Sequence, residues 1–163
     1  MRRIKLDKID RRILRDLQSD GRMTNVELAR RAGISAPPCL RRGRALEEAG
    51  FIRGFHADVD PALLGYGVTV FASVGLSSQA ETDLRAFERL AGSWPEVREC
   101  HMLAGENDFL LRVVAEDWDT YQRFLTTRLT AAPNVSHVKS ALAIRSAKEL
   151  PGVPIDEAVA DPV

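Results

Sequence analysis

The sequence predicts an α+β protein in which a helical N-terminal domain precedes a domain of alternating strands and helices. Two observations lead to this prediction. Three short apolar patterns of helical period occupy residues 7–50, and capping residues and glycines separate them. From residue 68 onward, strand-like and helix-like segments follow one another in the order β-α-β-β-α-β.

Helix punctuation defines the first two helices. Asp7 can cap the first helix, which we expect to end before Gly21. Thr24 and Glu27 have the spacing of a capping box, so the second helix is expected to begin at Thr24. Gly33 is expected to end that helix.

A third helix follows a turn of three to four residues. Ser35 is expected to cap it, so that Pro37 and Pro38 fall at its second and third positions. Backbone N–H groups at those positions have no acceptor within the helix, and proline is tolerated there. Two helices joined by a tight glycine-containing turn indicate a helix-turn-helix, and the whole N-terminal domain is expected to be a winged helix-turn-helix.

The third helix has two distinct faces. Cys39 and Leu46, seven residues apart, are expected to face the core with Ile13 and Leu28. Gly43 lies on the same inward stripe, where a branched aliphatic residue would fill the core. The opposite face combines small residues with arginines, which suits a helix that enters the major groove. It contains Ala36, Pro37, Leu40, Arg41 and Arg44.

The charge distribution supports contact between the N-terminal domain and a polyanion. The net charge is zero, yet residues 1–56 contain 14 Lys/Arg and 7 Asp/Glu, and the rest of the chain is acidic to the same extent. The alternative is a solvated basic surface without a partner. We expect double-stranded DNA as the partner, with Arg30 and Arg31 on phosphates. The complete set of expected DNA-binding residues is Thr24, Arg30, Arg31, Ser35, Ala36, Pro37, Leu40, Arg41, Arg42 and Arg44.

The second half predicts a ferredoxin-like βαββαβ domain, with one antiparallel sheet and two helices on one of its faces. The expected strands cover residues 68–76, 97–103, 108–115 and 135–144, and the helices cover 81–92 and 117–131. Residues 51–61 are expected to form a strand and hinge. The predicted division is 1–54 for the helix-turn-helix domain, 55–66 for a hinge strand and linker, 67–149 for the ferredoxin-like effector and oligomerisation domain, and 150–163 for a flexible C-terminal tail.

Self-association is expected because the second face of the sheet needs a cover. The third strand is apolar throughout, and the fourth contains Val135, Val138 and Leu142, with Ile144 at its end. We expect these residues to bury against a second copy of the chain.

Several stretches resemble the Lrp/AsnC family of transcriptional regulators, also called leucine-responsive or feast/famine proteins. The N-terminal stretch is LDKIDRRILRDLQSDGRMTNVELARRAGIS, followed by ALEEAGFIRGFHADVD, and the C-terminal stretch is VRECHMLAGENDFLLRV. The resemblance covers about residues 5–149. It implies a DNA-binding regulator that forms homodimers, which often assemble to octamers, and that responds to a small amino-acid effector.

The resemblance also places the effector site in the loop LAGENDF. Backbone N–H groups around Gly105 can receive a carboxylate, and Asp108 can hold an α-ammonium group or orient the loop. The alternative is a plain tight hairpin in which Gly105 supplies a positive φ and Asp108 caps backbone amides. The full set of expected effector-binding residues is Gly105, Glu106, Asn107, Asp108 and Ser140.

Other functions are disfavoured. His56, His101 and His137 lack the spacing of metal ligands, and Cys39 and Cys100 lack a CxxC spacing, so no metal or cofactor is expected. An enzyme resembling siroheme decarboxylases is the alternative on the same scaffold, for which the sheet would offer His101 and Arg112. A pure ligand-binding module is disfavoured by residues 5–56. Without a long apolar run or a secretory leader, the chain is expected to be cytoplasmic, with no membrane partner.

Overall fold

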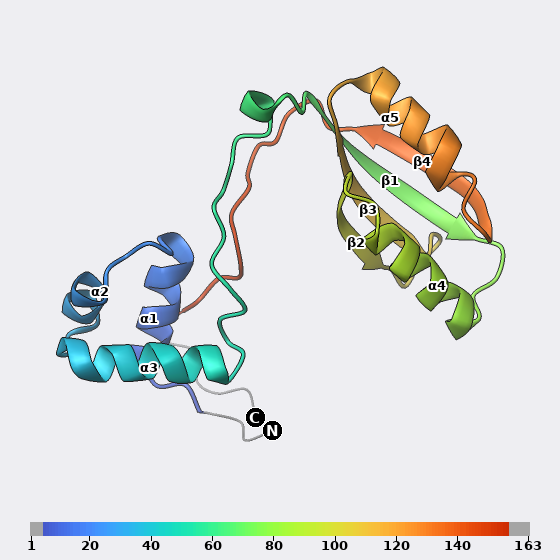
Figure 1. Cartoon of the computed structure of the whole chain (residues 1–163). Helices are drawn as coiled ribbons and strands as arrows, with labels where there is room; N and C mark the ends of the chain where they lie inside the picture. Colours follow the sequence, from blue (N-terminus) through green and yellow to red (C-terminus); the bar gives the residue numbers. More distant parts are fainter. Residues whose placement is uncertain (1–4, 157–163) are drawn as a thin grey trace. The chain divides into compact units, whose positions relative to one another are not determined.

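The computed structural model describes residues 5–156 and divides the chain into two compact units (Figure 1). Among the described residues, the first unit contains the chain up to Asp58 together with the segment that begins at Lys148. The second unit extends from Val59 to Ala147. Each unit has its own hydrophobic core. No helix among the described residues is long and apolar enough to cross a bilayer.

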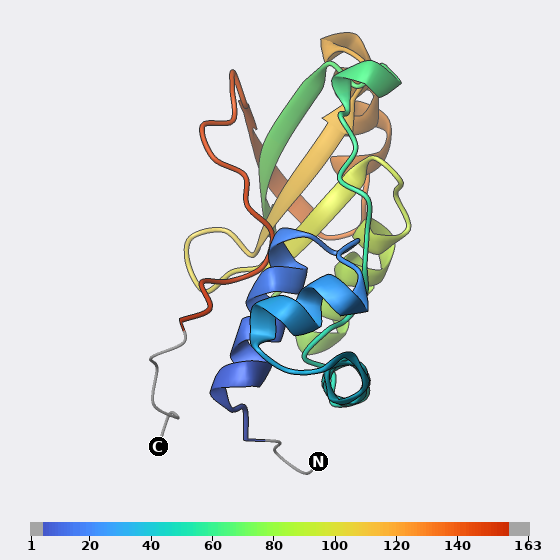
Figure 2. The same ribbon diagram turned by 90° about the vertical axis from the view of Figure 1, so that its left-hand side faces the viewer.

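Three helices form the first unit: α1 (Lys8–Ser19), α2 (Asn25–Ala32) and α3 (Ala36–Glu48). Figure 2 looks almost along the axis of α3 and shows α1 and α2 packed beside it. The expected inward residues Ile13, Leu28, Cys39 and Leu46 are all buried in one cluster, which confirms the predicted faces of the helices. Gly33 ends α2 in the left-handed conformation, with φ of 71°.

The caps of α2 and α3 differ from the prediction. Ser35 is the N-cap of α3, but its side chain caps nothing. A serine cap accepts from the N–H of the second or third helical residue, and Pro37 and Pro38 have no N–H. The box at α2 forms only in part: Thr24 Oγ1 accepts from the Glu27 N–H at 3.3 Å, whereas the Glu27 carboxylate turns to arginines.

The complete capping box is instead at α1. Asp7 accepts from the Asp10 N–H at 2.8 Å, and the Asp10 carboxylate accepts from the Asp7 N–H at 3.2 Å. Both backbone donors are thereby satisfied by carboxylates at the positive end of the helix dipole. Asp10 is 7% exposed, so this cap lies partly inside the unit.

The second unit has the predicted βαββαβ order. Its elements are β1 (Val68–Leu76), α4 (Glu81–Gly92), β2 (Val97–Met102), β3 (Phe109–Ala115), α5 (Trp118–Phe124) and β4 (Val135–Leu142). The spatial order of the strands is β2-β3-β1-β4, and all neighbours are antiparallel. Helix α5 continues into a π-helical segment (Leu125–Leu129). Both α4 and α5 lie on one face of the sheet (Figure 1).

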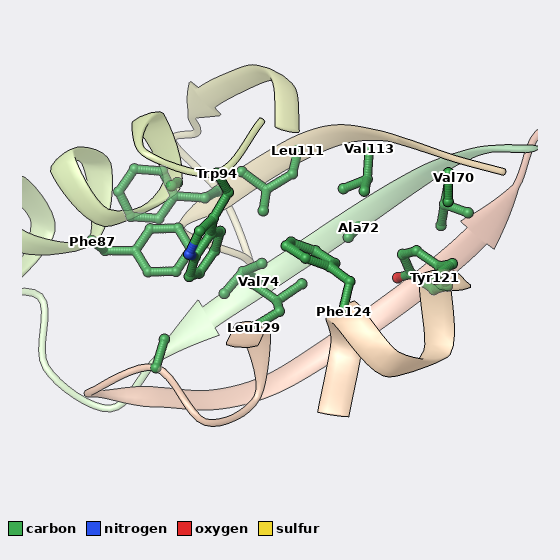
Figure 3. Close-up of a cluster of buried hydrophobic side chains, with 14 of the residues drawn as sticks. Val70, Ala72, Val74, Phe87, Trp94, Leu111, Val113, Tyr121, Phe124 and Leu129 are labelled. Carbon is green, nitrogen blue, oxygen red and sulfur yellow. The ribbon is translucent and has the colours of Figure 1, made fainter. Parts of the chain in front are cut away.

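The core of this unit lies between the sheet and its helices. Alternate residues of β1 and β3 point toward the helices, so each strand contributes one of its two faces. Aromatic rings fill the space above them. The ring centroids of Phe87 and Phe109 lie 4.8 Å apart, and those of Trp94 and Phe124, which meet edge to face, lie 5.4 Å apart. Figure 3 shows the rings of Phe87, Trp94 and Phe124 gathered over the strands.

The strand predicted for residues 51–61 is wrong, because no residue of this stretch belongs to a strand. A strand requires a hydrogen-bonded neighbour, and the described residues offer this stretch none. The linker instead contains a short 3₁₀ helix (Ala62–Leu64).

The prediction of which residues bury against a second copy of the chain also requires correction. Val135 and Val138 pack against the core under the helices, and Leu142 pairs with the buried Val70. Since side chains alternate along a strand, the uncovered face of the sheet consists of other residues. Within the second unit, Phe71, Leu110 and Val114 lie on that face, and Ile144 lies past the strand, 94% exposed.

The C-terminal segment touches the first unit within its described part, residues 150–156. Gln18 on α1 donates to the carbonyl of Val153 at 2.7 Å and accepts from its N–H at 3.1 Å. Gly152 has φ of 71°, and a Cβ there would collide with the Gln18 side chain. The rest of the predicted tail, residues 157–163, lies outside the described residues.

Candidate DNA-binding and effector surfaces

The turn between α2 and α3 is held by local hydrogen bonds. The N–H of Ile34 bonds the carbonyl of Ala29 at 3.0 Å behind Gly33. Asn25, at the start of α2, donates from its side chain to the carbonyl of Ala36 at 2.8 Å. This contact ties the first turn of α3 to α2. The orientation of the third helix is therefore fixed at its N-terminal end.

Most of the outer face of α3 is exposed as predicted, but Ala36, which was expected on this face, is half-buried and packs against the core of the first unit. Pro37, Leu40, Arg41 and Arg44 are exposed, and Leu40 is 44% exposed although it is apolar. Within residues 5–156, neither Arg41 nor Arg44 has an ion-pair or hydrogen-bond partner on its side chain. Both guanidinium groups are thus available to an external anion.

Arg42 is engaged inside the unit, although the sequence grouped it with the DNA-binding arginines. Its Nη1 donates to carboxylate oxygens of Asp7 and Asp10, each at 2.7 Å. Burial of Asp7 raises its pKa, but hydrogen bonds from the Asp10 N–H and from Arg42 outweigh this, and the pKa of Asp7 is lowered. Arg42 therefore links α3 to the capping box of α1.

Arg30 and Arg31 share one acceptor. Glu27 accepts from Arg30 Nη2 at 2.6 Å and from Arg31 Nε at 2.8 Å. These hydrogen bonds lower the pKa of Glu27 to about 2. The Arg30 side chain is 71% exposed, and solvent screens so exposed a pair until it contributes little to stability. Either arginine can therefore exchange Glu27 for a phosphate at small cost.

The loop between β2 and β3 reaches across the end of β1 to β4. Lys139 on β4 donates to Glu106 at 3.0 Å, and the His137 imidazole Nε2 lies 3.2 Å from Asn107 Oδ1. Asp108, the last residue of the loop, is 9% exposed and bonds β1 and the segment that follows β1. Its carboxylate accepts from the Leu76 N–H at 2.7 Å and from Gln79 Nε2 at 2.9 Å.

These contacts bear on the roles expected in this loop. Both oxygens of Asp108 already accept hydrogen bonds, an arrangement that favours orientation of the loop over capture of an ammonium group. Gly105 is not among the described residues with positive φ, so the hairpin alternative is wrong on that point. A Cβ on Gly105 would meet no atom within 4 Å, and the backbone around it is open.

Ser140 lies apart from this loop. Its hydroxyl bonds the Tyr121 hydroxyl of α5, on the face that the helices cover. His137 and Lys139 point from the opposite face, because the side chains of β4 alternate. The structure thus brings Gly105, Glu106, Asn107 and Asp108 together and leaves Ser140 on the other side of the sheet.

The sequence did not indicate the partners of the loop. Lys139, His137 and Gln79 contact it from segments about 30 residues away along the chain. Only the alternation within β4 could have suggested that His137 and Lys139 share a face. In the sheet, His101 and Arg112, considered for a tetrapyrrole, both contact Glu99.

Comparisons with known proteins identify the two domains. Residues 6–53 match the winged helix-turn-helix DNA-binding model, and residues 69–153 match the Lrp/AsnC ligand-binding domain model. The leucine-responsive regulatory protein of Rhizobium meliloti is 54% identical over 147 residues, which cover 90% of this chain and 94% of that protein. The Bkd operon transcriptional regulator of Pseudomonas aeruginosa is 43% identical, with coverage of 86% and 92%.

Solved structures show the same architecture. A transcriptional regulator from Neisseria meningitidis, in complex with L-Met, is 34% identical, with a TM-score of 0.90 and coverage of 95% of this chain and 100% of that one. An AsnC family transcriptional regulator from Agrobacterium tumefaciens is 36% identical, with a TM-score of 0.87 and coverage of 94% and 100%.

A DNA-binding domain joined to a ligand-binding domain defines a ligand-responsive transcriptional regulator, and nothing favours the alternative enzyme. The chain belongs to the Lrp/AsnC family. The predicted family, its two-domain fold and its regulatory function are thereby confirmed.

Proposed function

We propose that α3 enters the major groove of operator DNA and reads it with Ala36, Pro37, Leu40, Arg41 and Arg44. The observation that supports this proposal best is that Arg41 and Arg44 are exposed and without a partner among the described residues, whereas Arg42 between them is held by carboxylates. Arginines fork onto guanine or clamp phosphates, and small residues allow close approach. Leu40 suits the methyl group of thymine.

The residues around the reading face are assigned to the DNA backbone. Thr24, Ser35, Arg30 and Arg31 are exposed at the start and end of α2 and at the start of α3. The Ser35 hydroxyl caps no backbone N–H, so it is available to a phosphate oxygen. Arg30 and Arg31 would exchange Glu27 for phosphates. Such contacts position the domain without reading sequence.

The functional unit is a homodimer that assembles further, to an octamer. Phe71, Leu110 and Val114 give the uncovered face of the sheet apolar surface around the Arg112–Glu99 ion pair, and a second copy would bury this surface. Two copies of α3, placed about 34 Å apart, would read a pseudo-palindromic pair of half-sites. A regulator of bacterial promoters acts in the cytoplasm, where the DNA lies.

The effector is a free amino acid, bound at the loop 104–108. Open backbone around Gly105 suits the α-carboxylate, and the described Neisseria relative is in complex with L-Met. Asp108 orients the loop through Leu76 and Gln79. Binding where dimers meet would shift the assembly and so the affinity for DNA, with a coupling of about 1 to 3 kcal/mol.

One experiment tests both halves of this proposal. Thermal shift with each of the twenty amino acids identifies the effector, and fluorescence anisotropy measures binding to promoter fragments with and without it. We expect at least one amino acid to raise the melting temperature and to change the DNA affinity. A protein that retards no promoter fragment at low ionic strength, with or without amino acids, would contradict the proposal.

A further inference from the structure

The loop between β2 and β3 has an unusual set of anchors. Glu106, Asn107 and Asp108 are consecutive, and each bonds a group outside the β2-β3 hairpin. Asp108 is held from β1 and the segment after it. Glu106 and Asn107 are held from β4, which is separated from β3 by the whole width of β1. Two of the three loop residues are therefore held by side chains of β4.

His137 occupies a site that the backbone leaves open for it. It pairs with Gly75 across the β1-β4 ladder, and a Cβ on Gly75 would lie 2.0 Å from the imidazole Cε1. Only glycine at position 75 leaves room for the ring, whose Nε2 reaches Asn107. The ladder also shifts register between Gly75 and Leu76, at the edge of this contact.

The second nitrogen of the imidazole fixes the direction of the ring. Nδ1 lies 3.0 Å from Ser136 Oγ, and this hydroxyl donates to the carbonyl of Gly75 at 2.9 Å. Both ring nitrogens therefore have partners, one on the sheet and one on the loop. The chain Gly75, Ser136, His137, Asn107 connects the backbone of β1 to the tip of the loop.

Lys139 adds a charge contact on the same face. Its ammonium group lies 3.0 Å from the Glu106 carboxylate and lowers the pKa of that group. Lys139 is two residues beyond His137, so the two side chains lie side by side on β4. Together they hold two neighbouring loop residues on the side away from Asp108.

We propose that His137 and Lys139 are positioning residues of the effector site, which hold the loop 104–108 in the conformation that receives an amino acid. This inference rests on the proposed effector function. Neither residue needs to touch the ligand. They act through Asn107 and Glu106, and they determine how far the open backbone at Gly105 is ordered before binding. Ordering before binding increases affinity because less conformational entropy is lost.

The test uses the full-length chain in four forms: wild type, Lys139→Glu, the reversed pair Glu106→Lys/Lys139→Glu, and His137→Ala. The control is Arg128→Glu, which breaks a less exposed ion pair with Glu96 in the same unit. Hydrogen exchange is followed on a peptide that covers residues 103–109. Titration calorimetry with L-leucine and L-methionine measures affinity. Melting temperature is recorded for every form.

We expect Lys139→Glu and His137→Ala to speed hydrogen exchange in the loop peptide about fivefold, which is what the loss of an exposed contact allows. We expect both variants to weaken effector binding by a similar factor. The reversed pair should restore both quantities toward wild type, and Arg128→Glu should leave the loop unchanged. Unchanged exchange in both single variants would overturn the inference. A rise in exchange throughout the sheet, without rescue by the reversed pair, would also overturn it.

The exchange measurement separates this inference from the proposed function. It requires no ligand, so it decides whether His137 and Lys139 hold the loop even in a protein that binds neither amino acid. Failure of the wild type to bind any of the twenty amino acids would count against the effector assignment. Normal binding by variants with a loosened loop would count against the positioning role alone.

Discussion

The guanidinium of Arg42 on α3 lies 2.7 Å from the carboxylate of Asp10 on α1, so the middle arginine of the third helix is part of the domain's own framework. Asp10 also completes the capping box of α1 through the Asp7 N–H. One buried carboxylate therefore stabilises the start of α1 and the position of α3. Within residues 5–156, the side chain of Arg41, the preceding residue, makes no such contact.

The first prediction follows from this contrast. Arg42→Ala should lower the free energy of unfolding by about 1 kcal/mol. This is the contribution of a charge-assisted hydrogen bond, reduced because the side chain is partly exposed. Arg41→Ala, its matched control, should change stability by less than about 0.5 kcal/mol. Thermal denaturation of both variants measures the difference. Equal stability of the two would mean that the contact with Asp10 contributes nothing.

The contribution of Arg42 should depend on pH. The lowered pKa of Asp7 means that the folded protein binds a proton there less readily than the unfolded chain does. The stabilisation is therefore present above the ordinary value of 3.8 and is lost as the pH falls through the lowered value. Denaturation at several pH values gives the difference in free energy of unfolding between wild type and Arg42→Ala. We expect this difference to shrink below about pH 4. A stability difference that does not change with pH would show that the contact of Arg42 with Asp7 does not contribute to it.

The predictability of the fold had a local basis. The helices of the first unit and the βαββαβ order follow from periodicity and from capping residues within a few positions of one another. The contact of Arg42 joins residues 32 and 35 positions apart, so no local pattern distinguishes it from Arg41 or Arg44. The empty cap at Ser35 could have been predicted, because the sequence already shows prolines at both donor positions.

The face of β4 was harder to predict. Val138 and Ser140 point toward the helices, and His137 and Lys139 point away, but an alternating pattern does not say which set faces the core. That choice depends on pairing with β1, where Val74 opposite Val138 is buried. The sequence could therefore group Ser140 with the loop 104–108, although Ser140 lies on the other face of the sheet.

Gly43 offers a test of the register of α3. The sequence placed it on the inward stripe with Cys39 and Leu46, but it is only half-buried, and a Cβ there would meet no atom within 4 Å. Gly43→Val should raise the melting temperature slightly, because it improves helix propensity by up to ~0.5 kcal/mol without a steric clash. Calorimetry measures the change. A rise far above this propensity gain would show that the valine side chain is buried in the core, and a lower melting temperature would contradict the helical position of Gly43.

Asp108→Ala should separate effector response from DNA binding. The substitution leaves the buried N–H of Leu76 without its acceptor, which costs about 1 to 3 kcal/mol, and releases Gln79 from the loop. We expect the amino-acid response to be lost while basal affinity for DNA persists. Anisotropy with and without amino acids gives both quantities. A retained response would remove Asp108 from the effector site.

The central claim is that Arg41 and Arg44 meet DNA and Arg42 does not. Its most direct measurement is the affinity for an operator fragment as a function of salt, for wild type, Arg41→Ala, Arg42→Ala and Arg44→Ala, well below every melting temperature. We predict that Arg41→Ala and Arg44→Ala each weaken binding about tenfold. Where the arginine contacts a phosphate, the slope of log affinity against log salt concentration should become shallower by about one. Arg42→Ala should bind as wild type. Wild-type affinity and salt slope in Arg41→Ala and Arg44→Ala would contradict the claim.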